Sequence, residues 1–395
     1  MARPESHSAV FPWRGGNRFQ LLIDGDQFYP AMLHAIGAAR SHVLLEMYLI
    51  ESGQIADRFI ATLHAAAASG VAVYLLLDDF GARGLNRGDR ERLQQGNITV
   101  VYYNRLRYGE LRRNFFRDHR KLLAVDGRIA FVGGAGISDV FAPPQHPEQA
   151  WRETVVAIKG PVVADWQTLF RHTWRHAARA TLTLPPVPAP GAAGMQRGRV
   201  NYTRGFSFPE IKSMVINRVR AAHTRVWLAT AYFVPSIKLR RVLRQAARRG
   251  VDVRLLLPGE HTDHPAIRHA GRRFYHRLLR DGVRIFEYQP RFTHSKILLC
   301  DEWVTIGSSN IDRWTLRWNL EANQEIDDGP FASKVGAVLE QDFRDSHEWQ
   351  FAEWRKRPWH RRLRETFWGR VDIWLERLFH RPPSRHSPQR KNKSK

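Results

Sequence analysis

Short apolar segments recur in two regions of the chain, in the same order. The first region contains VLLEMYLI and, after a stretch with helical periodicity, VAVYLLL; the second contains VWLATAYFV and then VDVRLLL. Continuous apolar runs of this length, rich in branched residues, predict strands covered on both faces. Gly70 and Gly250 each stand just before the later strand, where a glycine typically ends a helix. The pattern therefore predicts two copies of a helix–strand–helix–strand unit.

A further strand extends each copy, and a linker separates the copies. A glycine-containing turn leads into another apolar run in both regions, within QQGNITVVYYN and RDGVRIFEYQP. The segment LPPVPAPGAAG is rich in proline and glycine, which is typical of a linker. We therefore expect an α/β protein with two similar halves. The expected parts are an N-terminal half (1–180), a linker (181–199), a C-terminal half (200–351) and a tail (352–395).

The charge balance narrows the class of partner. The 395 residues include 62 Lys and Arg against 38 Asp and Glu, a formal net charge of +24. Such a surplus favours nucleic acid, an anionic membrane surface or phosphorylated substrates. The lone cysteine, Cys300, excludes an internal disulfide and a cysteine-rich metal site. We find no apolar stretch long enough to span a membrane and no signal-peptide core. The expected location is the cytoplasm, with peripheral attachment to the inner membrane.

The tail carries much of the positive charge. Residues 352–395 hold 14 Lys and Arg against four acids. Apolar residues recur there at spacings of three and four, which predicts a basic amphipathic helix; they are Trp359, Leu363, Phe367, Val371, Trp374, Leu375 and Leu378. Two interpretations stay open: a helix lying on anionic lipids, or a helix packed on the protein's own core. The final segment, RPPSRHSPQRKNKSK, has the composition of a disordered segment.

A His-x-Lys-x4-Asp pattern occurs once in each half, as HRKLLAVD and HSKILLCD. Its six residues are His119, Lys121 and Asp126 in the first copy and His294, Lys296 and Asp301 in the second. Each copy is followed by a return segment rich in small residues, FVGGAGISD and TIGSSNID. One such match is weak, but two in the same local context indicate a two-histidine site that handles a phosphodiester.

Strand geometry predicts how the motif residues group together. Residues i and i+2 of a strand point to the same face, so the histidine and lysine of each copy are expected to face one way. Asp126-Gly127 predicts a hairpin turn, which folds the return segment back onto the motif strand. Small residues beside each His-Lys pair would let a phosphate approach closely. These candidate substrate-binding residues are Gly133 and Gly134 in the first half and Gly307, Ser308 and Ser309 in the second.

Two such units predict a covalent route for phosphodiester chemistry. One neutral imidazole attacks phosphorus, while the other, protonated, donates its proton to the leaving alkoxide and then serves as base. Two lysines hold the non-bridging oxygens. The pKa values of the two histidines must then differ. This route requires no metal ion and no other cofactor, and a complete site lies within one chain.

The aspartates are open to two interpretations. Asp126 is either a turn former or a catalytic carboxylate. Asp301 is followed by Glu302, a poorer turn, which favours a role in orienting a histidine or lysine.

The repeated motif with its glycine- and serine-rich return strand resembles the phospholipase D superfamily, over about residues 17–350. Within that superfamily the chain is most similar to bacterial cardiolipin synthases, on segments such as NRFQLLIDGDQFYPAMLHAI, WRETVVAIKGPVV and GSSNIDRWTLRWNLEAN. The resemblance implies two α/β units related by a pseudo-two-fold axis, with the site at their interface. It also implies transfer of a phosphatidyl group between anionic phospholipids, two phosphatidylglycerols giving cardiolipin and glycerol, with phosphatidylethanolamine as another candidate partner.

The resemblance also assigns residues. The six motif residues become the catalytic set, Ser308 and Asn310 become partners of the second motif, and Asp263 lines or supports the substrate pocket. The family has an asparagine where this chain has Gly136, which implies that the two halves are unequal.

Three other functions remain as alternatives. A nuclease or nucleic-acid phosphodiesterase would explain the charge, but the densest mixture of tryptophan and arginine is patterned as a helix and not as a base-stacking platform; no nucleic acid is expected. A phospholipase that uses water as acceptor differs only in pocket shape. A non-enzymatic lipid-binding protein would not need both motifs. A metal site is not expected, because the spacings in GEHTDHPAIRHAGRRFYH fit no familiar zinc pattern.

Overall fold

The computed structural model describes residues 10–110, 113–203, 210–310, 318–358 and 367–368. The first half of the chain forms seven strands and four helices: β1 (Arg14–Ile23), α1 (Asp24–Gly37), β2 (His42–Met47), α2 (Gln54–Ala68), β3 (Ala72–Asp78), α3 (Arg87–Leu93), β4 (Ile98–Tyr103), β5 (Lys121–Val125), β6 (Ile129–Gly133), β7 (Thr154–Lys159) and α4 (Val163–Ala178).

The second half repeats this order. Its elements are β8 (Gln196–Tyr202), α5 (Glu210–Ala221), β9 (Arg225–Ala229), α6 (Ile237–Arg248), β10 (Asp252–Pro258), α7 (Pro265–Arg272), α8 (Tyr275–Arg280), β11 (Arg284–Tyr288), β12 (Ile297–Cys300), β13 (Trp303–Gly307), β14 (Ala322–Asp327) and α10 (Gly329–Arg344). A short strand, β15 (Ser346–Glu348), and the helix α11 (Phe351–Arg355) follow. The strand order of the whole sheet is β15-β11-β10-β9-β12-β13-β14-β8-β1-β7-β6-β5-β2-β3-β4.

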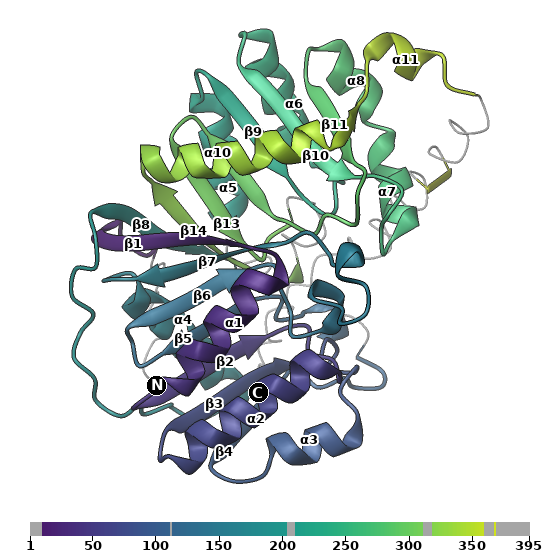
Figure 1. Cartoon of the computed structure of the whole chain (residues 1–395). Coiled ribbons are helices and arrows are strands. Elements are labelled where there is room, and N and C mark those ends of the chain that lie inside the picture. Colours follow the sequence, from purple (N-terminus) through teal and green to yellow (C-terminus); the bar gives the residue numbers. More distant parts are fainter. Residues whose placement is uncertain (1–9, 111–112, 204–209, 311–317, 359–366, 369–395) are drawn as a thin grey trace, which may run out of the picture.

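The two halves are joined into one sheet at the antiparallel pair β1 and β8 (Figure 1). From this pair outward, the strand order is β1-β7-β6-β5-β2-β3-β4 in the first half. The corresponding order in the second half is β8-β14-β13-β12-β9-β10-β11. Parallel pairs, such as β2 with β3 and β9 with β10, lie toward the two ends of the sheet, and antiparallel pairs fill its centre. This arrangement confirms the expected duplicated α/β fold.

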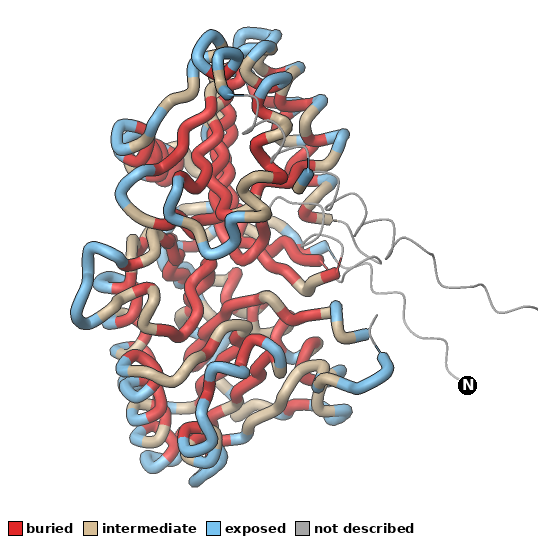
Figure 2. The backbone as a smooth tube through the Cα atoms, turned by 90° about the vertical axis from the view of Figure 1, so that its right-hand side faces the viewer, coloured by how far each residue is buried: buried red, intermediate tan, exposed pale blue. Residues whose placement is uncertain are grey.

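Helices cover both faces of the sheet. Helices α4 and α10 lie on a core that runs through both halves, since Trp166 and Phe170 belong to the same buried cluster as Phe331 and Leu339. On the other face, α1 and α2 cover the first half and α5 and α6 the second, each over a separate buried cluster. Buried backbone accordingly fills the middle layer in both halves (Figure 2). Strands enclosed in this way need continuous apolar runs, as the sequence has.

The expected segment boundaries need small changes. Helices α2 and α6 end shortly before Gly70 and Gly250, and both glycines have positive φ, as expected of residues that stop a helix. Strand β8 begins at Gln196, inside the segment taken as linker. The predicted tail helix lies almost entirely outside the described residues. Among the described residues, no helix is long and apolar enough to cross a bilayer.

Candidate active site

Each motif histidine directly precedes a central strand of its half. Lys121 is the first residue of β5 and pairs with Met47, the last residue of β2. In the second half, Ile297 at the start of β12 pairs with Ala229 at the end of β9. Both motifs therefore lie at the carboxyl ends of parallel strands, the edge where ligands commonly bind in α/β sheets.

Backbone bonds attach each motif to the opposite half of the molecule. The N–H of His119 donates to the carbonyl of Leu320 at 3.0 Å, and the N–H of Leu320 donates to the carbonyl of Arg117 at 2.9 Å. In the same way, the N–H of His294 donates to the carbonyl of Arg152, and the N–H of Arg152 donates to Phe292, both at 2.8 Å. These two small bridges bring the motifs together from positions far apart in the chain, as the interface location implied by the resemblance requires.

A glutamate from the opposite half contacts each histidine. Glu153 precedes β7 in the first half, and its Oε2 lies 2.6 Å from Nδ1 of His294. Glu321 precedes β14 in the second half, and its Oε1 lies 2.9 Å from Nδ1 of His119. Both carboxylates are fully buried. At His294 this contact is a hydrogen bond, which keeps a proton on Nδ1 and leaves Nε2 for chemistry; at His119 the contact is a close approach of the two groups.

Our sequence analysis did not identify these glutamates. Both occupy the same place in the repeat, directly before the strand that follows the hairpin, in WRETVV and NLEANQ. The sequence analysis predicted no strand in either segment. Aligning the two halves through this third strand would have revealed an acid at equivalent positions.

The two lysines lie beside their own histidines. The Nζ of Lys121 donates to the carbonyl of His119 at 2.7 Å, and the Nζ of Lys296 lies 3.1 Å from Nε2 of His294. Lys296 also lies 3.7 Å from Glu153 Oε2. Both lysines are buried, as the shared face of the motif predicts. The site therefore presents two imidazoles and two ammonium groups in one enclosed place.

Burial changes the protonation of these groups. Removal from water lowers the pKa of Lys121 to about 7, although Glu321 opposes the shift. Burial likewise raises the pKa of Glu153 to about 7, against the pull of Lys296. For His294, burial and the nearby cation of Lys296 lower the pKa well below its ordinary value. Burial lowers the pKa of His119 too, but Glu321 counteracts this. The two imidazoles thus have unlike surroundings, which acid–base catalysis with two histidines needs.

Aromatic rings line the same place. The ring of Tyr48 lies 4.5 Å from that of His119, centroid to centroid, and Lys121 Nζ lies 5.1 Å from the centre of the Tyr48 ring. The ring of Tyr232 lies 6.5 Å from that of His294. The hydroxyl of Tyr232 donates to Asp263. Tyr232 therefore links Asp263 to the surroundings of the second histidine.

The motif aspartates do not lie with the histidines. Asp126 is at the opposite end of β5, where its carboxylate accepts the backbone N–H groups of Arg40, Ser41 and His42 at 2.8–2.9 Å. Asp301 is at the opposite end of β12 and accepts N–H groups from residues 223–225 at 2.9–3.0 Å. Both have φ of 52° and form the hairpin turns. This corrects their place in the catalytic set and the orienting role expected of Asp301, because the histidine-orienting carboxylates are the two glutamates.

The small residues of the return strands support the glutamates. The hydroxyl of Ser308 donates to Glu321, and the N–H of Ser308 donates to the carbonyl of Ala322 at 3.1 Å. At the equivalent place in the first half, a Cβ on Gly134 would stand 2.2 Å from Oε2 of Glu153. Gly133 similarly packs against the backbone of Thr154. These residues therefore lie in contact with the two carboxylates or with the strands that follow them.

The asymmetry between Gly136 and Asn310 has a steric cause. Asn310 is buried, with its Oδ1 3.5 Å from the hydroxyl of Thr230. A Cβ on Gly136 would stand 2.7 Å from the carbonyl oxygen of Leu49, so an asparagine has no room there. The halves are therefore unequal at this position, as the sequence implied.

In the described part of the chain, no group of three or more His, Cys, Asp and Glu residues is arranged to hold a metal ion.

Comparison with known proteins gives the family. The family model described as "Cardiolipin synthase, PLD-like domain" matches residues 32–174 and 215–343, one match in each half. Cardiolipin synthase A of Pseudomonas aeruginosa is 35% identical over 352 residues, which cover 85% of this chain and 69% of that protein. Cardiolipin synthase B of Salmonella typhi is 36% identical over 332 residues, covering 81% and 78%.

A solved structure agrees on the fold. The crystal structure of phosphatidylserine synthase from Haemophilus influenzae Rd KW20 superposes with a TM-score of 0.69 at 13% identity, covering 91% of this chain and 94% of that one. Two histidine motifs in two similar halves, matched by one family model in each half, place the chain: it belongs to the phospholipase D-like cardiolipin synthase family.

Proposed function

We propose that this protein is a cardiolipin synthase that transfers a phosphatidyl group from one phosphatidylglycerol to the glycerol hydroxyl of another. The observation that supports this most is the pair of contacts that cross between the halves, Glu153 with His294 and Glu321 with His119. They supply two oriented imidazoles, one for attack and one for proton transfer. The family match indicates that phospholipids are the substrates.

The first step forms a phosphatidyl-enzyme. The Nε2 of one neutral histidine attacks phosphorus, and the bond from phosphorus to the headgroup glycerol oxygen breaks. The other histidine, protonated, gives its proton to the departing glycerol. Lys121 and Lys296 bind the non-bridging oxygens and stabilise the charge that builds on them in the transition state. The glutamate beside the attacking ring holds the imidazole as it becomes positively charged.

The second step reverses these roles. The histidine that gave its proton now accepts one from the glycerol hydroxyl of a second phosphatidylglycerol. That oxygen attacks phosphorus, the bond from phosphorus to Nε2 breaks, and cardiolipin leaves. The enzyme returns to its starting protonation, and the only by-product is the glycerol released in the first step. Phosphatidylethanolamine would enter at the first step, with ethanolamine as the group that leaves.

A membrane surface supplies these substrates. The net charge of +24 suits an anionic bilayer, and we propose that the protein binds peripherally to the cytoplasmic face of the inner membrane.

The test uses the purified full chain with phosphatidylglycerol vesicles in the presence of a chelator. Cardiolipin and glycerol, identified by mass spectrometry, are the expected products. Phosphatidic acid without cardiolipin would instead identify a hydrolase, and cleavage of single-stranded DNA with unchanged lipid would identify a nuclease. His119→Ala and His294→Ala should each abolish turnover with the fold intact by circular dichroism. His146→Ala, at an exposed histidine, is the matched control and should retain turnover.

A further inference from the structure

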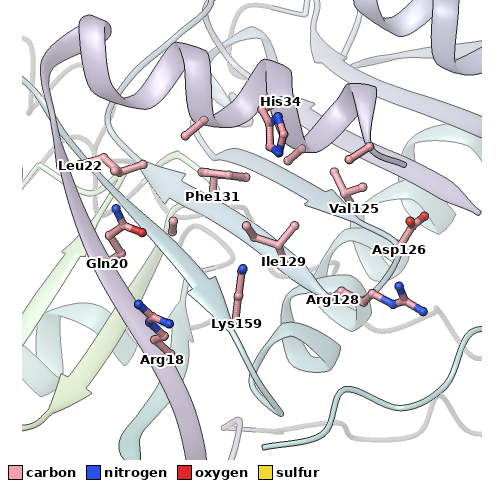
Figure 3. Close-up of a pocket in the computed structure, with 14 residues that line it drawn as sticks. Arg18, Gln20, Leu22, His34, Val125, Asp126, Arg128, Ile129, Phe131 and Lys159 are labelled. Atoms are coloured by element: carbon pink, nitrogen blue, oxygen red, sulfur yellow. The ribbon is translucent and has the colours of Figure 1, made fainter. Parts of the chain in front are cut away.

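A hollow lies between helix α1 and strands β1, β7, β6 and β5 of the first half (Figure 3). Its volume is about 520 Å³, within the range of small-molecule sites, which is roughly 300–1,000 Å³. It is distant from the histidines, because it opens beside Val125 and Asp126, at the opposite end of β5. The reaction proposed above does not use it.

The lining of this hollow changes character from one end to the other. Leu22 and Phe131 are buried and lie toward one end, under α1. Arg18, Lys159 and Arg128 are exposed and lie along the other end, as Figure 3 shows. The small residues Ala31, Ala35 and Ala38 on α1 leave the space above the strands open. A lining that is apolar at one end and cationic at the other matches an amphipathic anion.

The cations are uncompensated. Arg18 and Lys159 stand directly opposite each other on β1 and β7, an arrangement of like charges that destabilises a sheet. Within the described residues, no acidic side chain pairs with either of them or with Arg128. Among the described residues that line the hollow, Asp126 is the only acid, and its carboxylate accepts three backbone N–H groups.

The second half provides an internal comparison. The positions of Arg18 and Lys159 correspond to Arg197 and Asp327, which also stand directly opposite each other. There the charges are opposite, and Arg197 Nη1 lies 3.7 Å from Asp327 Oδ2. The same sheet position is therefore repulsive in one half and attractive in the other.

At other lining positions of the hollow, too, the second half has charged or aromatic side chains that are paired with each other. Gln20 and Ala157 correspond to Arg199 and Glu325, which form an ion pair at 3.0 Å. Ile129 corresponds to Trp303, whose ring is covered by Arg218 at 4.8 Å. A hollow of about 710 Å³ exists there as well, but its charged lining mixes both signs; it includes Arg218, Arg225, Asp301, Glu302 and Asp327. The fold thus makes a hollow in each half. The lining of the first holds one acid, Asp126, beside its apolar residues and cations, whereas the lining of the second holds three, Asp301, Glu302 and Asp327.

From this comparison we infer that the hollow under α1 binds a single-chain anionic amphiphile. Its acyl chain lies over Leu22 and Phe131, and its anionic head is held by Arg18, Lys159 and Arg128. The bound anion removes the repulsion between Arg18 and Lys159, so binding stabilises the folded protein.

Dodecyl phosphate, used below its micelle concentration, tests this inference by titration calorimetry. It should bind at least tenfold more tightly than inorganic phosphate, which lacks the tail, or dodecyl maltoside, which lacks the charge. Because the catalytic lysines also attract phosphate, the deciding comparison is between variants. Lys159→Asp, which copies the second half, should weaken binding at least tenfold. Lys238→Asp, the same charge change on exposed α6, should not.

A second variant tests the contact with the alkyl chain of the ligand. Ala35→Leu, which extends a side chain from α1 into the hollow, should weaken dodecyl phosphate but leave inorganic phosphate unchanged. Its melting temperature verifies the fold. Equal binding by wild type and Lys159→Asp, or equal affinity for dodecyl maltoside and dodecyl phosphate, would overturn the inference. Neither result bears on cardiolipin formation, which depends on the histidines.

Discussion

His294 and Glu153 belong to different halves of the chain, yet Nδ1 and Oε2 of these residues are 2.6 Å apart. The mirror contact joins His119 to Glu321. Each half therefore supplies the histidine of one pair and the carboxylate of the other. This exchange makes the active site a property of the assembled pair of halves, since neither half alone holds a complete histidine–glutamate unit.

Replacing Glu153 with glutamine should reduce turnover by roughly a hundredfold or more, because a neutral amide stabilises a charged imidazole poorly and permits the wrong tautomer. The assay is cardiolipin formation in phosphatidylglycerol vesicles, with circular dichroism to confirm folding. Glu148→Gln is a suitable control, since Glu148 is exposed and its Oε1 lies 3.3 Å from Nδ1 of the exposed His146. Wild-type turnover in Glu153→Gln would show that the contact has no catalytic role.

The pH dependence of kcat/KM should have a maximum near neutrality. Glu153, with its pKa raised to about 7, is protonated and ineffective at lower pH. Lys121, with its pKa lowered to about 7, loses its charge and its hold on phosphate at higher pH. In Lys121→Arg the fall of kcat/KM on the alkaline side should move to higher pH, because arginine stays protonated. Lys334→Arg, at an exposed position on α10, should leave the profile unchanged. If the alkaline fall of kcat/KM stays at the same pH in Lys121→Arg, then a group other than Lys121 causes it.

Asp301→Ala should lower stability and leave the chemistry largely intact. Its carboxylate accepts three backbone N–H groups, and loss of such charge-assisted bonds costs about 1–3 kcal/mol. The hydroxyl of Thr224, which also donates to this carboxylate, and these backbone bonds outweigh burial and lower the pKa of Asp301 to about 2, so the stabilisation is present at neutral pH and is lost as pH falls through about 2. Urea unfolding at pH 7 should therefore separate the variant from wild type.

The acid end of the pH range provides the check on Asp301. The stability difference between the variant and wild type should shrink as pH falls below 4. Glu302→Ala, at the exposed neighbour, should unfold like wild type. If folded Asp301→Ala lost activity completely at 25 °C, the aspartate would return to the catalytic set.

Gly134→Ala should impair catalysis through Glu153. The added Cβ would stand 2.2 Å from Oε2 of Glu153, so the carboxylate must move away from His294. We expect turnover to fall at least tenfold while KM changes little, because the substrate's own contacts remain. Gly191→Ala, where a Cβ meets nothing within 4 Å, is the control. An unaltered kcat in Gly134→Ala would mean that Glu153 is free to shift without consequence.

Removal of residues 359–395 should weaken binding to phosphatidylglycerol vesicles at low salt. This segment is rich in arginine and lysine, and each such charge near an anionic surface contributes about 1 kcal/mol. Vesicle sedimentation at increasing salt gives the measurement, since an electrostatic contribution weakens with ionic strength. Unchanged binding together with reduced solubility would instead support a tail helix that packs on the core.

The sequence by itself determined much of the architecture and chemistry. Apolar runs such as VAVYLLL and VDVRLLL predicted the enclosed strands, because a strand covered on both faces needs apolar residues at every position. The repeated motif predicted the roles of His119, Lys121, His294 and Lys296 from their spacing of two residues, although the strands themselves begin only at Lys121 and Ile297. Local pattern also located the turn at Asp126; Asp301, which we expected to orient a histidine or lysine, instead forms the second hairpin turn.

The tertiary structure decided the contacts made across the sheet. Glu153 and His294 are 141 positions apart, and no local periodicity connects them. The pairing of β1 with β8, together with the bridges at Leu320 and Arg152, brings the two halves into the register that joins these residues. The same holds for Arg18 and Lys159, whose opposition follows from the register of β1 with β7. The sequence of a strand fixes the spacing of its own side chains, but the packing of the whole sheet determines which residues of other strands they contact.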